Sequence, residues 1–147
     1  MNDESVLRFG THENFVEVGA VVERDLTLQS HGDVRLLVLV RSNGFSGHND
    51  LWVQRDALIA FAAQLAGLDS LLSGKAKLSS ISPGELELVI RSVSTRGHIG
   101  VAGSTGYRIQ SENATYQHSV SFWFEIEPSQ LSAALQRSWL SQYLLSR

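Results

Sequence analysis

The sequence predicts a single α+β domain in which a mainly antiparallel sheet of about six or seven strands is covered on one face by two amphipathic helices. Three observations predict this fold class. Several segments alternate apolar and polar residues with a period of two, two segments repeat apolar residues at helical spacing, and short connections rich in turn-forming residues separate many of them. The chain has 147 residues, 43% of them hydrophobic, which suffices for one domain with a sizeable core, and we assign residues 1–147 to it.

The first part of the chain predicts strands. Residues 15–23 alternate valine and alanine with other residues, which indicates a strand with one buried face. Residues 34–41 form the most apolar segment and carry apolar side chains on both faces, so they predict the central strand. The dipeptide Asn43-Gly44 predicts a tight reversal of the chain. We expect an irregular loop over residues 45–49 and a brief strand over residues 51–53.

Two amphipathic helices are predicted. The first begins near Asp56, whose carboxylate suits a helix N-terminus, and ends before Gly74. The second begins at Pro128-Ser129 and runs close to the C-terminus. Each helix needs a sheet to cover its apolar stripe, which comprises Leu58, Phe61, Ala62, Leu65 and Leu72 in the first helix and Leu131, Leu135 and Trp139 in the second, with Leu140 and Leu144 adjoining.

The segments between the helices predict further antiparallel strands. Residues 75–79 suit an edge strand, because exposed lysines discourage pairing with another chain. Residues 85–93 and 98–102 alternate around a short hairpin turn, and residues 118–127 predict the last strand. Residues 103–114 are rich in glycine, serine and threonine, so we expect a mobile loop there.

The overall composition excludes several function classes. Lys and Arg total 12 against 15 Asp and Glu, so no basic field is available to bind nucleic acid. The absence of cysteine removes disulfides, thiolate metal sites and cysteine nucleophiles. The N-terminal residues 1–5 are polar, and the longest strongly apolar run, residues 36–40, is far shorter than a membrane span. We therefore expect a soluble cytoplasmic protein that binds no membrane.

No motif in the sequence predicts catalysis or a cofactor. Gly97, Gly100, Gly103 and Gly106 recur at steps of three, but a phosphate-binding loop would follow a strand and open a helix, whereas these glycines run through a strand. They are better interpreted as bulges or flat places beneath a neighbouring segment. None of the serines lies in a nucleophile-elbow motif. The sequence therefore predicts neither an enzyme nor a cofactor.

The histidines supply the alternative hypothesis for function. His48, Asp50, His98 and His118 are the candidates to approach one another in space, but none has the close spacing of a metal motif, so no metal site is predicted. The alternative to a protein-binding function is a small-molecule or metal-binding protein, or an enzyme of unknown class. Its pocket would lie between helix and sheet near His48, Asp50 and His98.

An outward sheet face predicts a protein-binding surface. Alternation places Trp123 outward among carboxylates, as in a recognition patch where an aromatic anchor lies within a charged rim. Phe45, in the predicted loop, is the second anchor. The alternative to a different protein partner is that Trp123 is covered by a loop, by the N-terminal segment, or by a second copy in a homodimer. The carboxylates, which would otherwise form a solvated face, are Glu85, Glu87, Glu125 and Glu127.

An ordered series of short motifs over about half of the chain resembles the small bacterial WapI-type immunity proteins and related uncharacterised families. The motifs are Gly44-Phe45-Ser46-Gly47, Trp52-Val53, Asp56-Ala57-Leu58 with Phe61, Leu72-Ser73-Gly74-Lys75-Ala76, Ser82-Pro83-Gly84-Glu85 and Gly97-His98-Ile99. The resemblance implies a non-catalytic cytoplasmic protein that binds and neutralises a cognate toxin domain. The chain departs from this expectation in lacking a strongly acidic net charge, since its formal charge is −3. The family supplies no binding residues to transfer.

Overall fold

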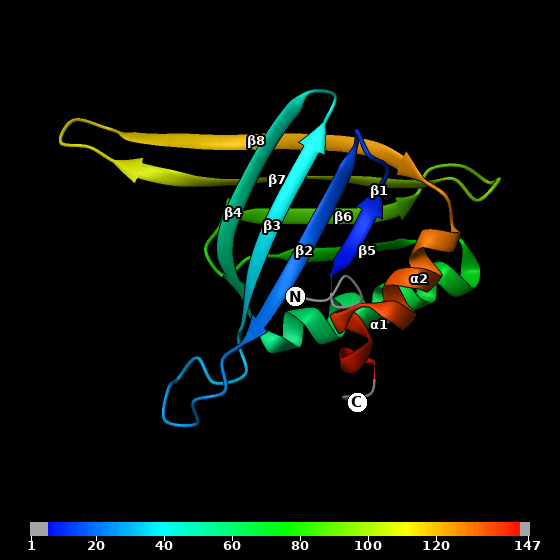
Figure 1. The fold of residues 1–147 in the computed structure, drawn as a ribbon, viewed down its shortest axis with the longest axis horizontal. Helices are drawn as coiled ribbons and strands as arrows, with labels where there is room; N and C mark the ends of the chain where they lie inside the picture. Colours follow the sequence, from blue (N-terminus) through cyan, green and yellow to red (C-terminus); the bar gives the residue numbers. More distant parts are fainter. Residues whose placement is uncertain (1–5, 145–147) are drawn as a thin grey trace.

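Two four-stranded antiparallel sheets make up most of the fold, with strand orders β1-β2-β3-β4 and β5-β6-β7-β8 (Figure 1). The computed structural model describes residues 6–144. Helix α1 (Arg55–Leu71) connects the sheets, and helix α2 (Ser129–Arg137) and a 3-10 turn, η2 (Trp139–Tyr143), follow the last strand. The strands are β1 (Leu7–Gly10), β2 (Phe15–Val22), β3 (Val34–Ser42), β4 (Phe45–Val53), β5 (Lys75–Ser79), β6 (Leu86–Ser92), β7 (Ile99–Gln110) and β8 (Thr115–Ile126).

The predicted α+β class with antiparallel strands and two helices is confirmed, but the prediction of one sheet of six or seven strands is wrong. The described chain forms eight strands in two sheets. Each sheet has one apolar face, and the two apolar faces cover each other. The prediction that the helices cover the face of a single sheet is therefore wrong. The helices lie together at one end of the first sheet and along the β5 edge of the second (Figure 1). The fully buried inner residues include Val34, Leu36 and Val40 of β3 and Leu86, Leu88 and Ile90 of β6.

Helix α1 follows its predicted stripe except at its ends. Leu58, Phe61, Ala62 and Leu65 are fully buried, and Leu68 joins them. Leu72 instead ends the helix in the left-handed conformation and is exposed. The N-cap is Gln54, so Asp56 lies in the first turn and does not cap the helix with its side chain.

Helix α2 ends at Arg137 and is therefore shorter than predicted, since we expected it to run close to the C-terminus. The Ser138 hydroxyl then accepts a hydrogen bond from the Leu140 amide and begins η2. Leu131 and Leu135 are buried as expected.

Two predicted loops are strands. The turn at Asn43-Gly44 is confirmed, with φ of 50° and 87°, but β4 begins immediately after it, so residues 45–49 pair with β3. Residues 103–110 likewise belong to β7, which pairs with β8 along its whole length. Residues 34–41 lie in an interior strand as predicted, although the outward Leu37 and Leu39 remain exposed. Pairing with a neighbour holds these segments extended despite a composition typical of loops.

Glutamine side chains from the helices cover two of the sheet edges. The Gly10 amide donates to Oε1 of Gln130 at 2.7 Å, and Nε2 of Gln130 donates back to the Gly10 carbonyl at 3.3 Å. Oε1 of Gln64 accepts from the Lys77 amide at 2.9 Å. Edge strands with free backbone groups tend to pair with other chains. The helices therefore protect β1 and β5, while β4 and β8 have no such cover from a glutamine within the described residues.

Gly103 and Gly67 provide a matched pair of substitutions. A Cβ atom at Gly103 would lie 1.9 Å from the Glu87 carbonyl oxygen, whereas nothing lies within 4 Å of one at Gly67 in α1. We expect Gly103→Ala to lower the free energy of unfolding by more than about 1 kcal/mol and Gly67→Ala to raise it by about 0.5–1 kcal/mol. Urea denaturation measures both, and equal effects would contradict the close approach of β6 and β7.

Candidate functional site

A two-stranded arm projects beyond strand β4. Strand β6 pairs with β7 only as far as Thr105, so from Gly106 onward β7 pairs with β8 alone. We call residues 106–119 the arm; Figure 1 shows it extending past β4. Its inner face continues the core-facing side of β7 and β8 but is exposed to solvent. This face carries the directly paired residues Tyr107 and His118, and Ile109 and Tyr116.

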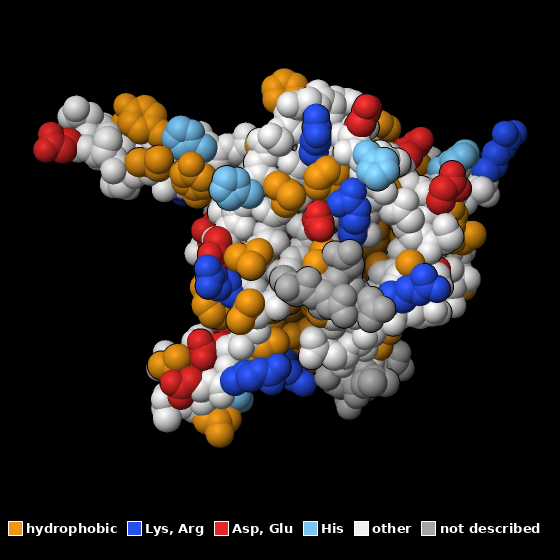
Figure 2. Space-filling view, in the orientation of Figure 1, with side chains coloured by type: hydrophobic (Ala, Val, Ile, Leu, Met, Phe, Trp, Pro, Cys, Tyr) orange, Lys and Arg blue, Asp and Glu red, His pale blue; other side chains and the backbone are white. Residues whose placement is uncertain are grey.

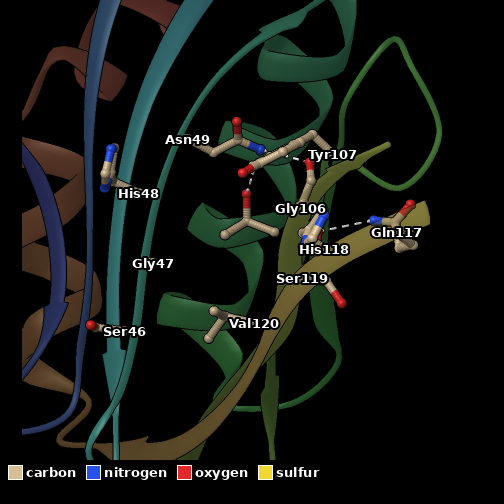
Figure 3. Close-up of a pocket in the computed structure, with 11 residues that line it drawn as sticks. Ser46, Gly47, His48, Asn49, Gly106, Tyr107, Gln117, His118, Ser119 and Val120 are labelled. Atoms are coloured by element: carbon tan, nitrogen blue, oxygen red, sulfur yellow. Dashed lines mark hydrogen bonds between the residues drawn. The ribbon is translucent and has the colours of Figure 1, made fainter. Parts of the chain in front are cut away.

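A groove lies between the arm and β4, with a volume of about 540 Å³ (Figure 3). The rings of Tyr107 and His118 stand side by side in it, with centroids 5.5 Å apart. His48 lies on the β4 side. A neighbouring hollow of about 580 Å³ continues over the outer face of β3 and β4, where Leu37, Leu39 and Tyr107 line it. The groove and the hollow form a step from the outer face of the first sheet down to the arm.

Asn49 holds the arm in place against β4. Its amide Nδ2 lies 2.7 Å from the Gly106 carbonyl oxygen, 3.1 Å from the Thr105 hydroxyl and 3.3 Å from the Glu85 carbonyl oxygen. The Thr105 hydroxyl itself donates to the Glu85 carbonyl at 2.7 Å. These contacts tie β4 to β7 at the point where the two sheets cross, so they set the position at which the arm emerges.

The structure divides the predicted pocket of His48, Asp50 and His98. His48 and Asp50 line the hollow beside β4, but His98 precedes β7 and bonds through Nδ1 to the Ser94 hydroxyl at 2.8 Å. Tyr107, which lines both the groove and the hollow, is nine residues after His98 along β7. At the rise of an extended strand, His98 therefore lies about 30 Å from this site. The residues that line the groove and the hollow come from strands, so the expected position between helix and sheet is wrong. His118 takes the place expected for His98 because β8 returns beside β7.

Asp50 forms an ion pair with Arg35 on the outer face of the first sheet. Nε of Arg35 donates to Oδ1 of Asp50 at 2.6 Å, and a second guanidinium nitrogen pairs with Oδ2. The hydrogen bonds from Arg35, and then its positive charge, lower the pKa of Asp50 below its ordinary value. Asp50 is therefore held as a carboxylate by a structural partner. Among residues 6–144, no three histidine, aspartate or glutamate side chains are placed to hold a metal ion.

Phe45 and Trp123, the two predicted anchors, lie at one corner of the molecule. Phe45 is 73% exposed at the start of β4 and pairs with Ser42 across the hairpin. The Trp123 amide donates to the Ser42 hydroxyl at 3.5 Å, which connects β8 to the end of that hairpin. Trp123 is 56% exposed, and Glu125 lies on the same face of β8. We call Phe45, Trp123, Glu125 and Glu127 the corner patch.

Glu85 and Glu87 lie apart from the corner patch, towards β6. Glu87 forms an ion pair with Lys77 at 3.7 Å and accepts a hydrogen bond from the Ser79 hydroxyl at 2.9 Å. Glu85 precedes β6 and is half-buried. The outer face of the second sheet is therefore less acidic than alternation alone suggested, because Lys75, Lys77 and Arg91 of β5 and β6 share it with the carboxylates.

Sequence reasoning missed the arm. Its signal was present, since Tyr107 and Ile109 alternate with polar residues and Tyr116 and His118 do the same on the returning strand. Figure 2 shows hydrophobic and histidine side chains running from the arm onto the body of the molecule.

No protein-family model matches the chain, and no curated protein or solved structure matches it significantly. Within residues 6–144, no helix has the length and apolar character needed to span a membrane.

Replacing Asn49 tests its role in positioning the arm. Asn49→Ala removes the amide from the crossing and takes its donor away from the Gly106 carbonyl, so we expect a loss of about 1–2 kcal/mol in the free energy of unfolding. Backbone amides of the arm should also exchange faster with deuterium. Asn113→Ala at the arm tip is the control. Unchanged exchange in the arm of Asn49→Ala would contradict this role.

The Arg35 and Asp50 pair predicts a pH effect. Because the pKa of Asp50 is lowered in the folded protein, its contribution to stability is present above the unfolded pKa and is lost as the pH falls through the folded value. We expect the difference in urea midpoint between wild type and Asp50→Asn to shrink as the pH falls from about 6 to 3. Glu112→Gln is the control, and a constant difference for Asp50→Asn would refute the assignment.

Proposed function

We propose that this protein is a non-catalytic cytoplasmic binding protein of the immunity type. It binds a cognate toxin domain through the corner patch and thereby neutralises it. The observation that carries the proposal is that Phe45 and Trp123 both adjoin Ser42, which pairs with Phe45 across the hairpin and accepts a hydrogen bond from the Trp123 amide at 3.5 Å. These two aromatic residues come from different sheets and are far apart in the sequence. The resemblance to WapI-type immunity proteins supports the choice of a toxin domain as partner.

The exposed aromatic rings provide the binding energy in this proposal. Tryptophan is enriched among residues whose truncation costs a complex 2 kcal/mol or more, and large apolar side chains lose little conformational freedom when they bind. Both rings are more than half exposed, so a partner can remove much of their surface from water.

The carboxylates of the patch select a basic partner. Glu125 and Glu127 are exposed, and neither belongs to an ion pair within the described part of the chain. They are therefore free to meet lysine or arginine side chains around the bound rings. Such charge pairs accelerate association and discriminate among partners more than they increase affinity. Glu85 and Glu87 contribute less, because Glu87 is already paired with Lys77.

Purified protein as bait, with a lysate of the source organism and mass spectrometry, identifies the partner. We expect one stoichiometric protein with a toxin-like domain whose activity the chain suppresses. Trp123→Ala and Phe45→Ala should each weaken binding by about 2 kcal/mol or more in calorimetry.

Trp52→Ala is the matched control for these variants, since Trp52 is 37% exposed but lies on the first sheet. It should leave the affinity for the partner unchanged. Wild-type affinity in both patch variants, with folding verified by circular dichroism, would refute the corner patch. Recovery of no toxin domain would remove the support for the immunity function itself.

A further inference from the structure

The outer face of the first sheet and the inner face of the arm form a second surface, separate from the corner patch. The exposed apolar residues of the sheet face are Val21, Leu37, Leu39 and Trp52, and those of the arm are Tyr107, Ile109 and Tyr116. The register places Val21, Arg35 and Trp52 in one row across β2, β3 and β4, with Leu37 and Leu39 in the next two rows. Figure 2 shows both parts on the same side of the molecule.

We propose that a second copy of this chain covers this surface, with the arm of each copy lying on the first sheet of the other. The arm continues the inner face of the second sheet, so it lies lower than the outer face of the first sheet by about the 10 Å spacing of packed sheets. A copy related by a twofold axis presents the same step inverted. Each arm then fills the step beside β4 of the other copy, where the groove and the hollow now lie.

The charges of the surface favour a second copy over a charged partner. Arg35 and Asp50 neutralise each other, and Arg8 pairs with Glu17 at 3.1 Å on the same sheet face. Arg41, near the end of β3, is exposed on this face and has no ion pair within residues 6–144. The arm face, formed by tyrosine, isoleucine and histidine, carries no carboxylate or lysine. The net charge of −3 leaves only weak repulsion between copies. The corner patch differs in this respect, because its carboxylates remain unpaired within the described chain.

The size of the surface is sufficient for a dimer. The arm is a ribbon about 20 Å long and 10 Å wide. Two arms and the two sheet faces that receive them bury an area on the order of 1,000 Å², which reaches the range of specific interfaces. An isolated two-stranded hairpin is only marginally stable in water, so a partner that covers its apolar face also stabilises the arm.

Sedimentation velocity over about 1–100 µM protein tests the proposal. We expect the wild type to form a dimer in this range and Ile109→Asp, at a side chain that is 47% exposed, to raise the dimer dissociation constant at least about 30-fold. Leu37→Lys should do the same from the sheet side. Tyr116→Arg, nearer the arm tip, replaces Ile109→Asp if that variant fails to fold. Leu71→Asp, at the far end of α1, is the control and should remain dimeric.

Mixing the two variants tests which surfaces meet. Each variant alone damages both halves of a twofold interface. In a heterodimer of Ile109→Asp with Leu37→Lys, one half is intact and the other brings the new aspartate near the new lysine. An equimolar mixture should therefore associate more tightly than either variant alone. If arm met arm and sheet met sheet, no half of the mixed interface would be intact.

Three results would overturn the proposal: a monomeric wild type at about 100 µM, a dimer insensitive to the arm and sheet variants, or no gain on mixing. Trp123→Ala separates this proposal from the proposed function. It should weaken partner binding and leave the dimer unchanged, so either proposal can fail without the other.

Discussion

The burial of two apolar sheet faces against each other is the interaction on which the rest of the structure depends. Each sheet alternates along its strands, so packing one inner face on the other removes both from water and turns every second residue outward. The helices then close one end of this arrangement and protect the edges of β1 and β5 through Gln130 and Gln64. The outer faces of both sheets remain open, and each proposed surface includes part of one of them.

Unequal strand lengths create the arm. Strands β7 and β8 have 12 residues each, whereas β6 has 7, so the longer pair runs beyond its neighbour. The alternation that buries Phe122 and Phe124 continues into Tyr116 and His118, but the first sheet ends at β4 and no longer covers it. An apolar face is thus carried into solvent by the same pattern that forms the core. Asn49 fixes the point at which this transition occurs.

The two outer surfaces differ in the physical basis of their specificity. The corner patch combines exposed aromatic rings with carboxylates that have no ion-pair partner in the described chain, which suits a basic partner. The stepped surface of the arm and the first sheet pairs Arg35 with Asp50 and Arg8 with Glu17, so most of its charges are neutralised internally, and in our proposal it receives its own inverted copy. A chain that uses both can bind a second copy on one side and a different protein on the other.

The sequence by itself determined the local elements and the direction of most side chains. Period-two patterns identified strands such as residues 85–93, the apolar stripe identified the buried face of α1, and Asn43-Gly44 identified a hairpin, because each signal depends on neighbouring residues alone. The tertiary structure decided that the strands divide into two sheets, that residues 103–110 extend as a strand, and that β8 reaches the hairpin of Phe45 through the Trp123 amide while His98 lies far from His48. These outcomes depend on pairing between distant segments, which supplies hydrogen bonds that local composition does not reveal.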